Sequence, residues 1–183
     1  MAELLTDDAW SDLFSTFSGT ARHLETRDHY HVPGEDRYLE QFLAGRYDDA
    51  ENRAYFADWT DPVSVAVKAG KRFERVRVVP SRLPPYLRLE VRWNQYNAEA
   101  GEEVSYLDRE RADRIGLPAH DFWVFDGERV ALMYFTAADR LLGADLITDP
   151  VVVERHERWM DLAAAHAVPY RKFVAADPAR ARP

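Results

Sequence analysis

The arginine pair Arg75 and Arg77 is the feature of this sequence with the clearest chemical potential. Both alternate with valines in the segment RVRVV, so an extended backbone places them on one face of a strand that is otherwise apolar. A buried guanidinium needs a compensating charge, and Glu90 follows closely in the chain. Two hypotheses stay open. The arginines form a structural ion-pair network, which we favour, or they hold a small anionic or nucleotide-like ligand.

Other polar and aromatic residues extend this candidate site. Glu25, Asp121 and Asp126 are further carboxylates that could pair with the arginines. The candidate ligand-binding residues are Arg75, Arg77, Arg88, Glu90, Asp121, Trp123 and Asp126. The aromatic residues that would wall a pocket are Tyr86, Trp93, Trp123 and Tyr134, although aromatic residues at such spacings more often belong to a core. The sequence contains no Gly-rich phosphate loop and no serine nucleophile elbow, so neither motif suggests another enzyme class.

The histidines raise the question of a metal site. His29 and His31 share one face if the chain is extended there, and Glu35 lies close in sequence, which gives three side chains of types that Zn²⁺ accepts. Such short-range groupings are common by chance, and we favour a solvated loop before Pro33. We therefore predict no metal and no cofactor.

Strand and turn signals dominate the C-terminal part of the chain. Asp126-Gly127 separates two β-rich runs and supplies the positive φ angles of a tight hairpin turn. A third strand is expected from Leu141 to Ile147. Asp149 then caps a helix whose first residue is Pro150, where the missing proline N–H costs nothing. Together these signals predict an α/β unit.

The middle of the chain alternates between strand and helix. The run from Phe73 to Pro80 reads as a strand, and Val104 to Leu107 reads as a second one. The segment between them fits either a strand or a helix. We predict a helix, because Pro84-Pro85 suits a helix start and Gly101 suits the position after its end.

Helical signals dominate before residue 70. The expected elements are a helix after the N-cap Thr6, a strand from Thr20 to Thr26, a helix after Pro33-Gly34 that buries Tyr38, Leu39, Phe42 and Leu43 and stops at Gly45, and a helix from Asp61 to Gly70. We predict an α/β fold (α+β as a whole): a helical segment at 1–70 packed on the same core, a mixed sheet flanked by helices at 71–174, and a disordered tail at 175–183.

Composition limits the classes of protein that this chain can represent. The 183 residues include no cysteine, which excludes disulfides and thiolate metal ligands and fits a reducing cytoplasm. There is no basic and apolar leader and no long apolar run, so we expect a cytoplasmic protein without a membrane span. The formal charge of −8 argues against direct binding to nucleic acid.

Several segments carry a resemblance to known families. The pieces are RVRVV, AGEEV, DFWVFD and the Asp149-Pro150 helix. In their order they resemble one half of the phospholipase D-like fold, in a degenerate form. The whole chain from Leu13 to Phe173 also resembles an uncharacterised actinobacterial domain family that is often encoded beside helix-turn-helix regulators. The resemblance implies a regulatory module that acts through a protein partner, such as a helix-turn-helix regulator.

The same resemblance bears on catalysis and assembly. Phospholipase D-like enzymes use a His-x-Lys motif followed by Asp. Here His120 would take the His position, but Phe122 stands at the Lys position and Asp126 lies one residue early. Because Phe122 cannot bind a phosphate oxygen, we predict no phosphodiesterase activity, with His120 as the only catalytic candidate. A half-domain can be completed by a second copy, so we also expect a homodimer.

Overall fold

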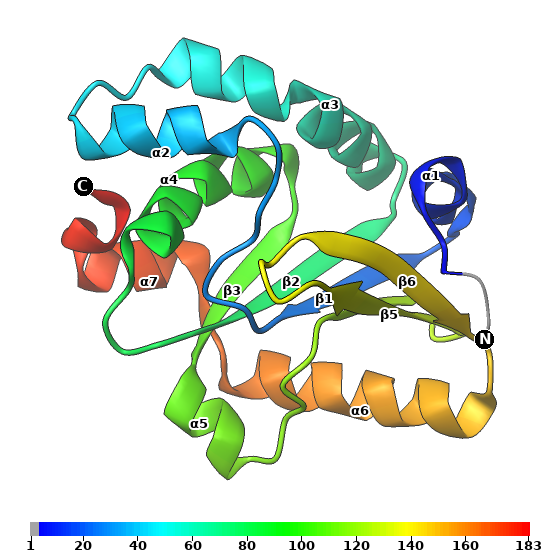
Figure 1. Cartoon of the computed structure of the whole chain (residues 1–183). Helices are drawn as coiled ribbons and strands as arrows, with labels where there is room; N and C mark the ends of the chain where they lie inside the picture. The colour runs from blue at the N-terminus through cyan, green and yellow to red at the C-terminus, as the bar shows by residue number, and fades with distance from the viewer. Residues whose placement is uncertain (1–3) are drawn as a thin grey trace.

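A computed structural model describes residues 4–183 as an α/β fold (Figure 1). The strands are β1 (Thr20–Glu25), β2 (Arg72–Val79), β3 (Glu103–Asp108), β4 (Phe122–Phe125), β5 (Arg129–Phe135), β6 (Leu141–Ile147) and β7 (Val168–Pro169). The helices are α1 (Asp7–Thr16), α2 (Glu35–Leu43), α3 (Asp49–Lys68), α4 (Pro85–Ala100), α5 (Arg109–Arg114), α6 (Pro150–His166) and α7 (Tyr170–Ala176), followed by a 3-10 turn (Pro178–Ala181). The predicted fold class is confirmed.

The strands form one mixed sheet in the order β6-β5-β4-β1-β2-β3-β7. β1, β2 and β3 run parallel, whereas β4 pairs with β1 in the antiparallel direction. The N-terminal segment, which we expected to be helical apart from one strand, therefore supplies β1 to the middle of the sheet. The register of β1 and β2 sets His23 opposite Arg75 and Glu25 opposite Arg77.

Helices cover both faces of the sheet (Figure 1). On one face α6 packs over a cluster that includes Leu24, Val76, Phe122 and Met160. On the other face α1 and α3 contact a second cluster, which includes Phe73. The helices α2, α3 and α4 add an aromatic layer above this second face. The sheet therefore separates two environments, and side chains that alternate along a strand enter one or the other.

The hairpin turn at Asp126-Gly127 is confirmed. Asp126 and Gly127 have φ angles of 57° and 66°, as a tight turn of this type requires. The Asp126 carboxylate also accepts hydrogen bonds from the backbone N–H groups of Ser18 (2.8 Å), Gly19 (2.7 Å) and Thr20 (2.9 Å). It therefore ties the hairpin to the start of β1.

Two predicted helices have the expected ends. The ambiguous segment is the helix α4, and Gly101 follows it with a φ of 101°. A side chain at Gly101 would meet Val67 Cγ1 at 2.8 Å, so glycine is needed for space as well as for conformation. At α6 the Asp149 carboxylate accepts from the N–H groups of Val151 (2.9 Å) and Val152 (3.1 Å), as expected for an N-cap.

The predicted start of the third helix was wrong. We expected it at Asp61-Pro62, but α3 begins at Asp49, and Pro62 lies inside it. Asp48 caps the helix through the Glu51 N–H at 2.9 Å. Tyr55 and Phe56 pack with aromatic residues of α4 and stabilise the polar first half of the helix. The helix then continues through Pro62 despite the cost of a proline inside a helix. In α2, Leu43 is exposed rather than buried.

The C-terminal segment that we expected to be disordered has regular structure. Residues 175–183 complete α7 and form the 3-10 turn. Arg180 donates to the Phe173 carbonyl at 3.0 Å, and Ala181 packs against a core cluster. Aromatic contact between Phe173 and Tyr106, at 4.1 Å between ring centroids, anchors α7 to β3. Within residues 4–183, no helix is both long and apolar enough to cross a membrane.

Candidate functional site

A cavity of about 300 Å³ lies between the sheet and the layer formed by α2, α3 and α4. It opens over the carboxyl ends of β1 and β2, next to the point where the sheet changes from parallel to antiparallel pairing. Ligands of open α/β sheets bind preferentially outside the carboxyl ends of the strands. Aromatic side chains wall the cavity, including Phe14, Phe56, Trp59, Tyr86, Trp93 and Trp123.

The loop between β1 and α2 forms part of the cavity wall and is held in place by Asp121. The Asp121 carboxylate accepts from the Thr26 N–H at 2.8 Å and the Thr26 hydroxyl at 2.7 Å. It also accepts from the hydroxyl of Tyr30, which lines the cavity. His31 adds a backbone hydrogen bond to the Asp139 carbonyl at 3.0 Å. Asp121 therefore positions the loop but does not itself line the cavity.

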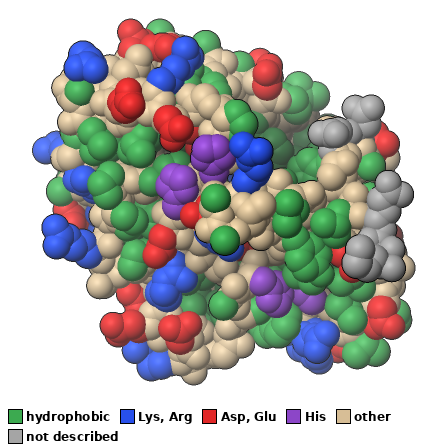
Figure 2. Space-filling model, in the orientation of Figure 1, with side chains coloured by type: hydrophobic (Ala, Val, Ile, Leu, Met, Phe, Trp, Pro, Cys, Tyr) green, Lys and Arg blue, Asp and Glu red, His purple; other side chains and the backbone are tan. Residues whose placement is uncertain are grey.

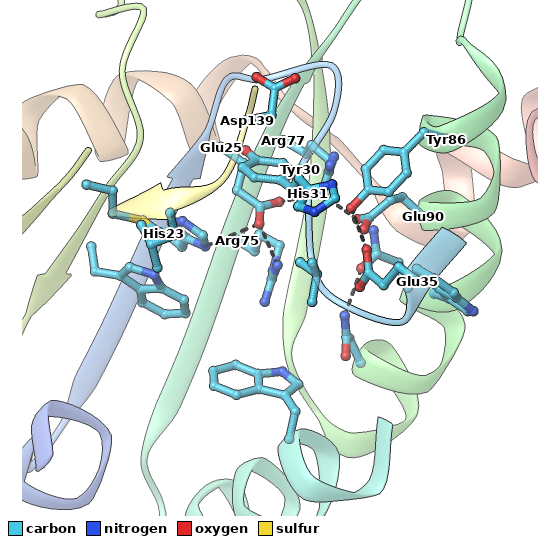
Figure 3. A pocket seen from close by; sticks show the side chains of 18 of the residues that line it. His23, Glu25, Tyr30, His31, Glu35, Arg75, Arg77, Tyr86, Glu90 and Asp139 are labelled. Atoms are coloured by element: carbon cyan, nitrogen blue, oxygen red, sulfur yellow. Dashed lines mark hydrogen bonds and ion pairs between the residues drawn. The ribbon is translucent and has the colours of Figure 1, made fainter. Parts of the chain in front are cut away.

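The two arginines form a buried ion-pair network at the cavity. Arg75 contacts Glu25 through Nη1 and Glu102 through Nε, both at 2.7 Å. Arg77 places Nη1 at 2.8 Å from Glu25 and 2.5 Å from Glu90. Figure 3 shows Glu25 between Arg75 and Arg77. The arginines therefore belong to a network of ion pairs, as the favoured hypothesis expects, and they also line a cavity.

The network controls the charge of the groups around it. Burial alone would raise the pKa of Glu25, but the charges of Arg75 and Arg77 outweigh burial and lower that pKa to about 2. Burial lowers the pKa of His23 to about 3, so its ring is neutral at physiological pH. The His23 ring stacks on Trp123 with centroids 4.1 Å apart. The network is therefore ionised, and the neighbouring imidazole is not.

Glu35 has a different environment from the other carboxylates of the cavity. It is 8% exposed and accepts from the hydroxyls of Tyr86 at 2.9 Å and Tyr55 at 3.4 Å. Burial, together with the charge of Glu90, raises the pKa of Glu35 to about 8. Carboxyl groups perturbed to this extent gather at functional sites. Figure 3 shows Glu35 facing the same space as Glu90 and Tyr86.

Several buried polar atoms at the cavity have no hydrogen-bond partner among the described residues. They are Nε and Nη2 of Arg77, Oδ1 of Asn97 and both ring nitrogens of His23. Each of these side chains is at most 4% exposed. Unsatisfied polar atoms are rare in folded proteins, and a group of them around one cavity is expected where a ligand binds.

The structure brings together some of the residues chosen from the sequence and not others. Arg75, Arg77, Glu90 and Trp123 line the cavity, as do the proposed wall residues Tyr86 and Trp93. Three candidates lie elsewhere, and the physical reasons differ. Arg88 donates to the Arg182 carbonyl at 3.2 Å, and Asp121 and Asp126 hold backbone N–H groups. Tyr134 is 40% exposed and does not wall the cavity.

The residues considered for metal binding do not form a ligand set. His31 and Glu35 line the cavity, whereas His29 lies against the Tyr86 ring with centroids 4.5 Å apart. Among the side chains that the structure describes, no group of three histidine or acidic residues is arranged to hold a metal ion. His31 and Glu35 therefore contribute to the cavity as separate polar groups.

His120, the only catalytic candidate from the sequence, lies on the other side of the sheet. Its ring is 6.0 Å from Phe122 and Trp159 and 5.9 Å from His156, measured between centroids. Phe122 belongs to the core beneath α6. Burial lowers the pKa of His120, with a smaller contribution from His156. His120 is therefore separated from the cavity by the sheet.

Sequence reasoning missed several residues of the cavity. His23 lies on the same face of β1 as Ala21 and Glu25, and the spacing of two residues in the sequence predicts this shared face. Trp59 and Asn97 come from helices whose facing surfaces depend on how they pack against each other. For these two residues the sequence carries no local signal.

The chain belongs to the family described as a domain of unknown function (DUF6879), whose model matches residues 8–175. No curated protein matches the chain. The family match covers the sheet, the helical layer and every side chain of the buried network. Family membership does not supply a reaction or a ligand, so the chemistry of the cavity has to carry the functional argument.

Proposed function

We propose that this member of the DUF6879 family is a non-catalytic regulatory module that binds a small molecule in the cavity between the sheet and α2–α4. One observation carries the proposal: an aromatic-walled cavity of about 300 Å³ surrounds buried polar atoms that lack partners. Ligand pockets combine these features, a mostly apolar wall with a few placed polar groups. A packed core would have filled the space and paired the polar atoms.

The chemistry of the cavity supports binding rather than catalysis. The described residues that line it include no serine, threonine, cysteine or lysine that would act as a nucleophile. The pKa of His23, about 3, is too low for an efficient general base near neutral pH. His120 has no access to the cavity, because the sheet lies between them.

The resemblance noted from the sequence adds the proposed setting. We propose a helix-turn-helix regulator as the partner, and self-association as a homodimer, with the edge strand β6 as the contact surface. Three leucines of β6 support this choice: Leu141, Leu142 and Leu146 are 39%, 51% and 38% exposed. Figure 2 shows hydrophobic side chains exposed on the face that β6 occupies in Figure 1. Sedimentation of the wild type and of Leu142→Glu tests the proposed homodimer. A wild-type dimer that the substitution dissociates supports β6 as the contact surface, and a wild-type monomer contradicts self-association.

Binding of a neutral fluorescent probe tests the cavity itself. We expect 1-aminonaphthalene, which is uncharged at neutral pH, to bind saturably with enhanced fluorescence. Val32 lines the cavity and is 41% exposed, so Val32→Trp should block it without disturbing the core. Val151→Trp, on the surface of α6, is the matched control because Val151 is 70% exposed and far from the cavity. Equal binding by both variants, or no binding by the wild type, would contradict the proposal.

A further inference from the structure

The ion-pair network beside the cavity contains more carboxylates than guanidiniums. Arg75 and Arg77 share the carboxylates of Glu25, Glu90 and Glu102. Both guanidiniums are already compensated, so an anionic ligand group placed beside them would also lie close to these carboxylates. Like charges at such short range disfavour binding. The charge balance therefore argues against the anionic or nucleotide-like ligand that the arginines alone had suggested.

Glu35 is the carboxyl group without a cation. Its two oxygens accept hydrogen bonds from tyrosine hydroxyls only, and no side chain within residues 4–183 forms an ion pair with it. It lines the cavity and is 8% exposed. A positively charged ligand group beside Glu35 would compensate this carboxyl group. Arg77 already pairs with Glu90 at 2.5 Å, but no lysine, arginine or histidine among the described side chains forms an ion pair with Glu35.

Asn97 provides a second and independent indication. Its Nδ2 donates to Asn94 Oδ1 at 2.8 Å, while its own Oδ1 is buried without a partner. Asn97 is 4% exposed and lines the same cavity, so this oxygen suits an N–H donor on a ligand. The free Nε and Nη2 of Arg77 suit an acceptor. A neutral acceptor fits there, because Glu25 and Glu90 already flank that guanidinium.

We propose that the cavity binds a compact organic cation: an amine with an aromatic or apolar body and its ammonium group against Glu35. This inference rests on the proposed function and names the ligand class. Trp59, Trp93 and Tyr86 line the cavity and are the aromatic side chains available to the cation and its body. The volume of about 300 Å³ accommodates a ligand of the size of a phenylethylamine.

Cation binding changes the protonation of Glu35. Four groups face it: Tyr55 from α3, Tyr86 and Glu90 from α4, and Arg77 from β2. With a pKa of about 8, Glu35 is mostly protonated at pH 7. An ammonium group favours the carboxylate, so the proton leaves Glu35 for the buffer as the ion pair forms. Binding of the amine should therefore release a proton and strengthen as the pH rises from 7 to 9.

Calorimetric titration of the purified full chain tests the inference with three matched probes. They are 2-phenylethylamine (cation), 2-phenylethanol (neutral) and 3-phenylpropionate (anion), each measured in phosphate and in Tris to count protons. We expect the dissociation constant of the amine to be lower than that of the alcohol by a factor of about ten or more. We also expect close to one proton released at pH 7, and the propionate to bind least.

Glu35→Gln should remove the proton release and the preference for the amine, while binding of 2-phenylethanol stays unchanged. Glu40→Gln is the control, because Glu40 is an exposed carboxylate on the same helix. If the neutral probe binds but the amine is not preferred, or if the Glu35→Gln protein keeps the preference, the ligand class is wrong and the binding module stands. If none of the three probes binds, both this inference and the proposed function are overturned.

Discussion

Removal of the Arg77 side chain should unfold the protein at a markedly lower temperature. Arg77 is 1% exposed and forms ion pairs with Glu25 and Glu90. In Arg77→Ala these two buried carboxylates lose their shared cation, and the loss of one partner of a buried pair costs about 3–5 kcal/mol. For a domain of this size, each kcal/mol lowers the melting temperature by about 2–4 °C, so the expected decrease is about 6–20 °C.

Thermal melts and urea titrations of wild type and variant at pH 7 measure this effect. Arg72→Ala is the matched control, since Arg72 pairs with Glu103 on the surface at 2.7 Å, with side chains 50% and 54% exposed. An exposed pair of this kind contributes at most about 1 kcal/mol. An Arg77→Ala midpoint at or above that of wild type would refute the reasoning, because it would mean that Arg77 adds strain instead of compensating buried charge.

Three further predictions concern the cavity, the hairpin and the absence of catalysis. The raised pKa of Glu35 means that the folded state retains a proton which the unfolded state loses, so its contribution to stability is complete below pH 4.5 and is lost as the pH rises toward 8. In urea titrations the free energy of unfolding of Glu35→Gln should therefore rise relative to that of wild type across that range, by up to about 1.4 kcal/mol per pH unit. Parallel pH profiles of the two proteins would contradict this. Asp126→Ala should lower the free energy of unfolding by about 1–3 kcal/mol, because three backbone N–H groups lose their acceptor, and an unchanged urea midpoint would count against that role. Bis-p-nitrophenyl phosphate should not be hydrolysed, and hydrolysis that His120→Ala abolishes would restore the enzyme hypothesis.

The arginine face was predictable because a strand alternates its side chains between two environments. Arg75 and Arg77 needed only that rule, and the partner Glu90 follows on the next helix. The hairpin at Asp126-Gly127 was also readable, since few dipeptides adopt two positive φ angles in succession. Both signals are local, and neither depends on how distant segments pack.

The rest of the cavity depends on packing between distant segments. The chemistry of Glu35 comes from Tyr55, twenty residues later, and from Tyr86, fifty-one residues later. The helix α3 was misjudged because Pro62 and a polar first half resemble a loop, whereas aromatic contacts with α4 stabilise the helix. Contacts between segments this far apart in the sequence cannot be predicted from the spacing or the helix propensity of these residues.

The most direct test of a ligand-binding cavity is a crystal structure of the protein with 2-phenylethylamine. We expect electron density for one molecule inside the cavity, with its nitrogen within hydrogen-bonding distance of the Glu35 carboxylate and its ring against Trp59 or Trp93. An empty or collapsed cavity in crystals grown at saturating amine, with density only at the surface, would contradict the central claim.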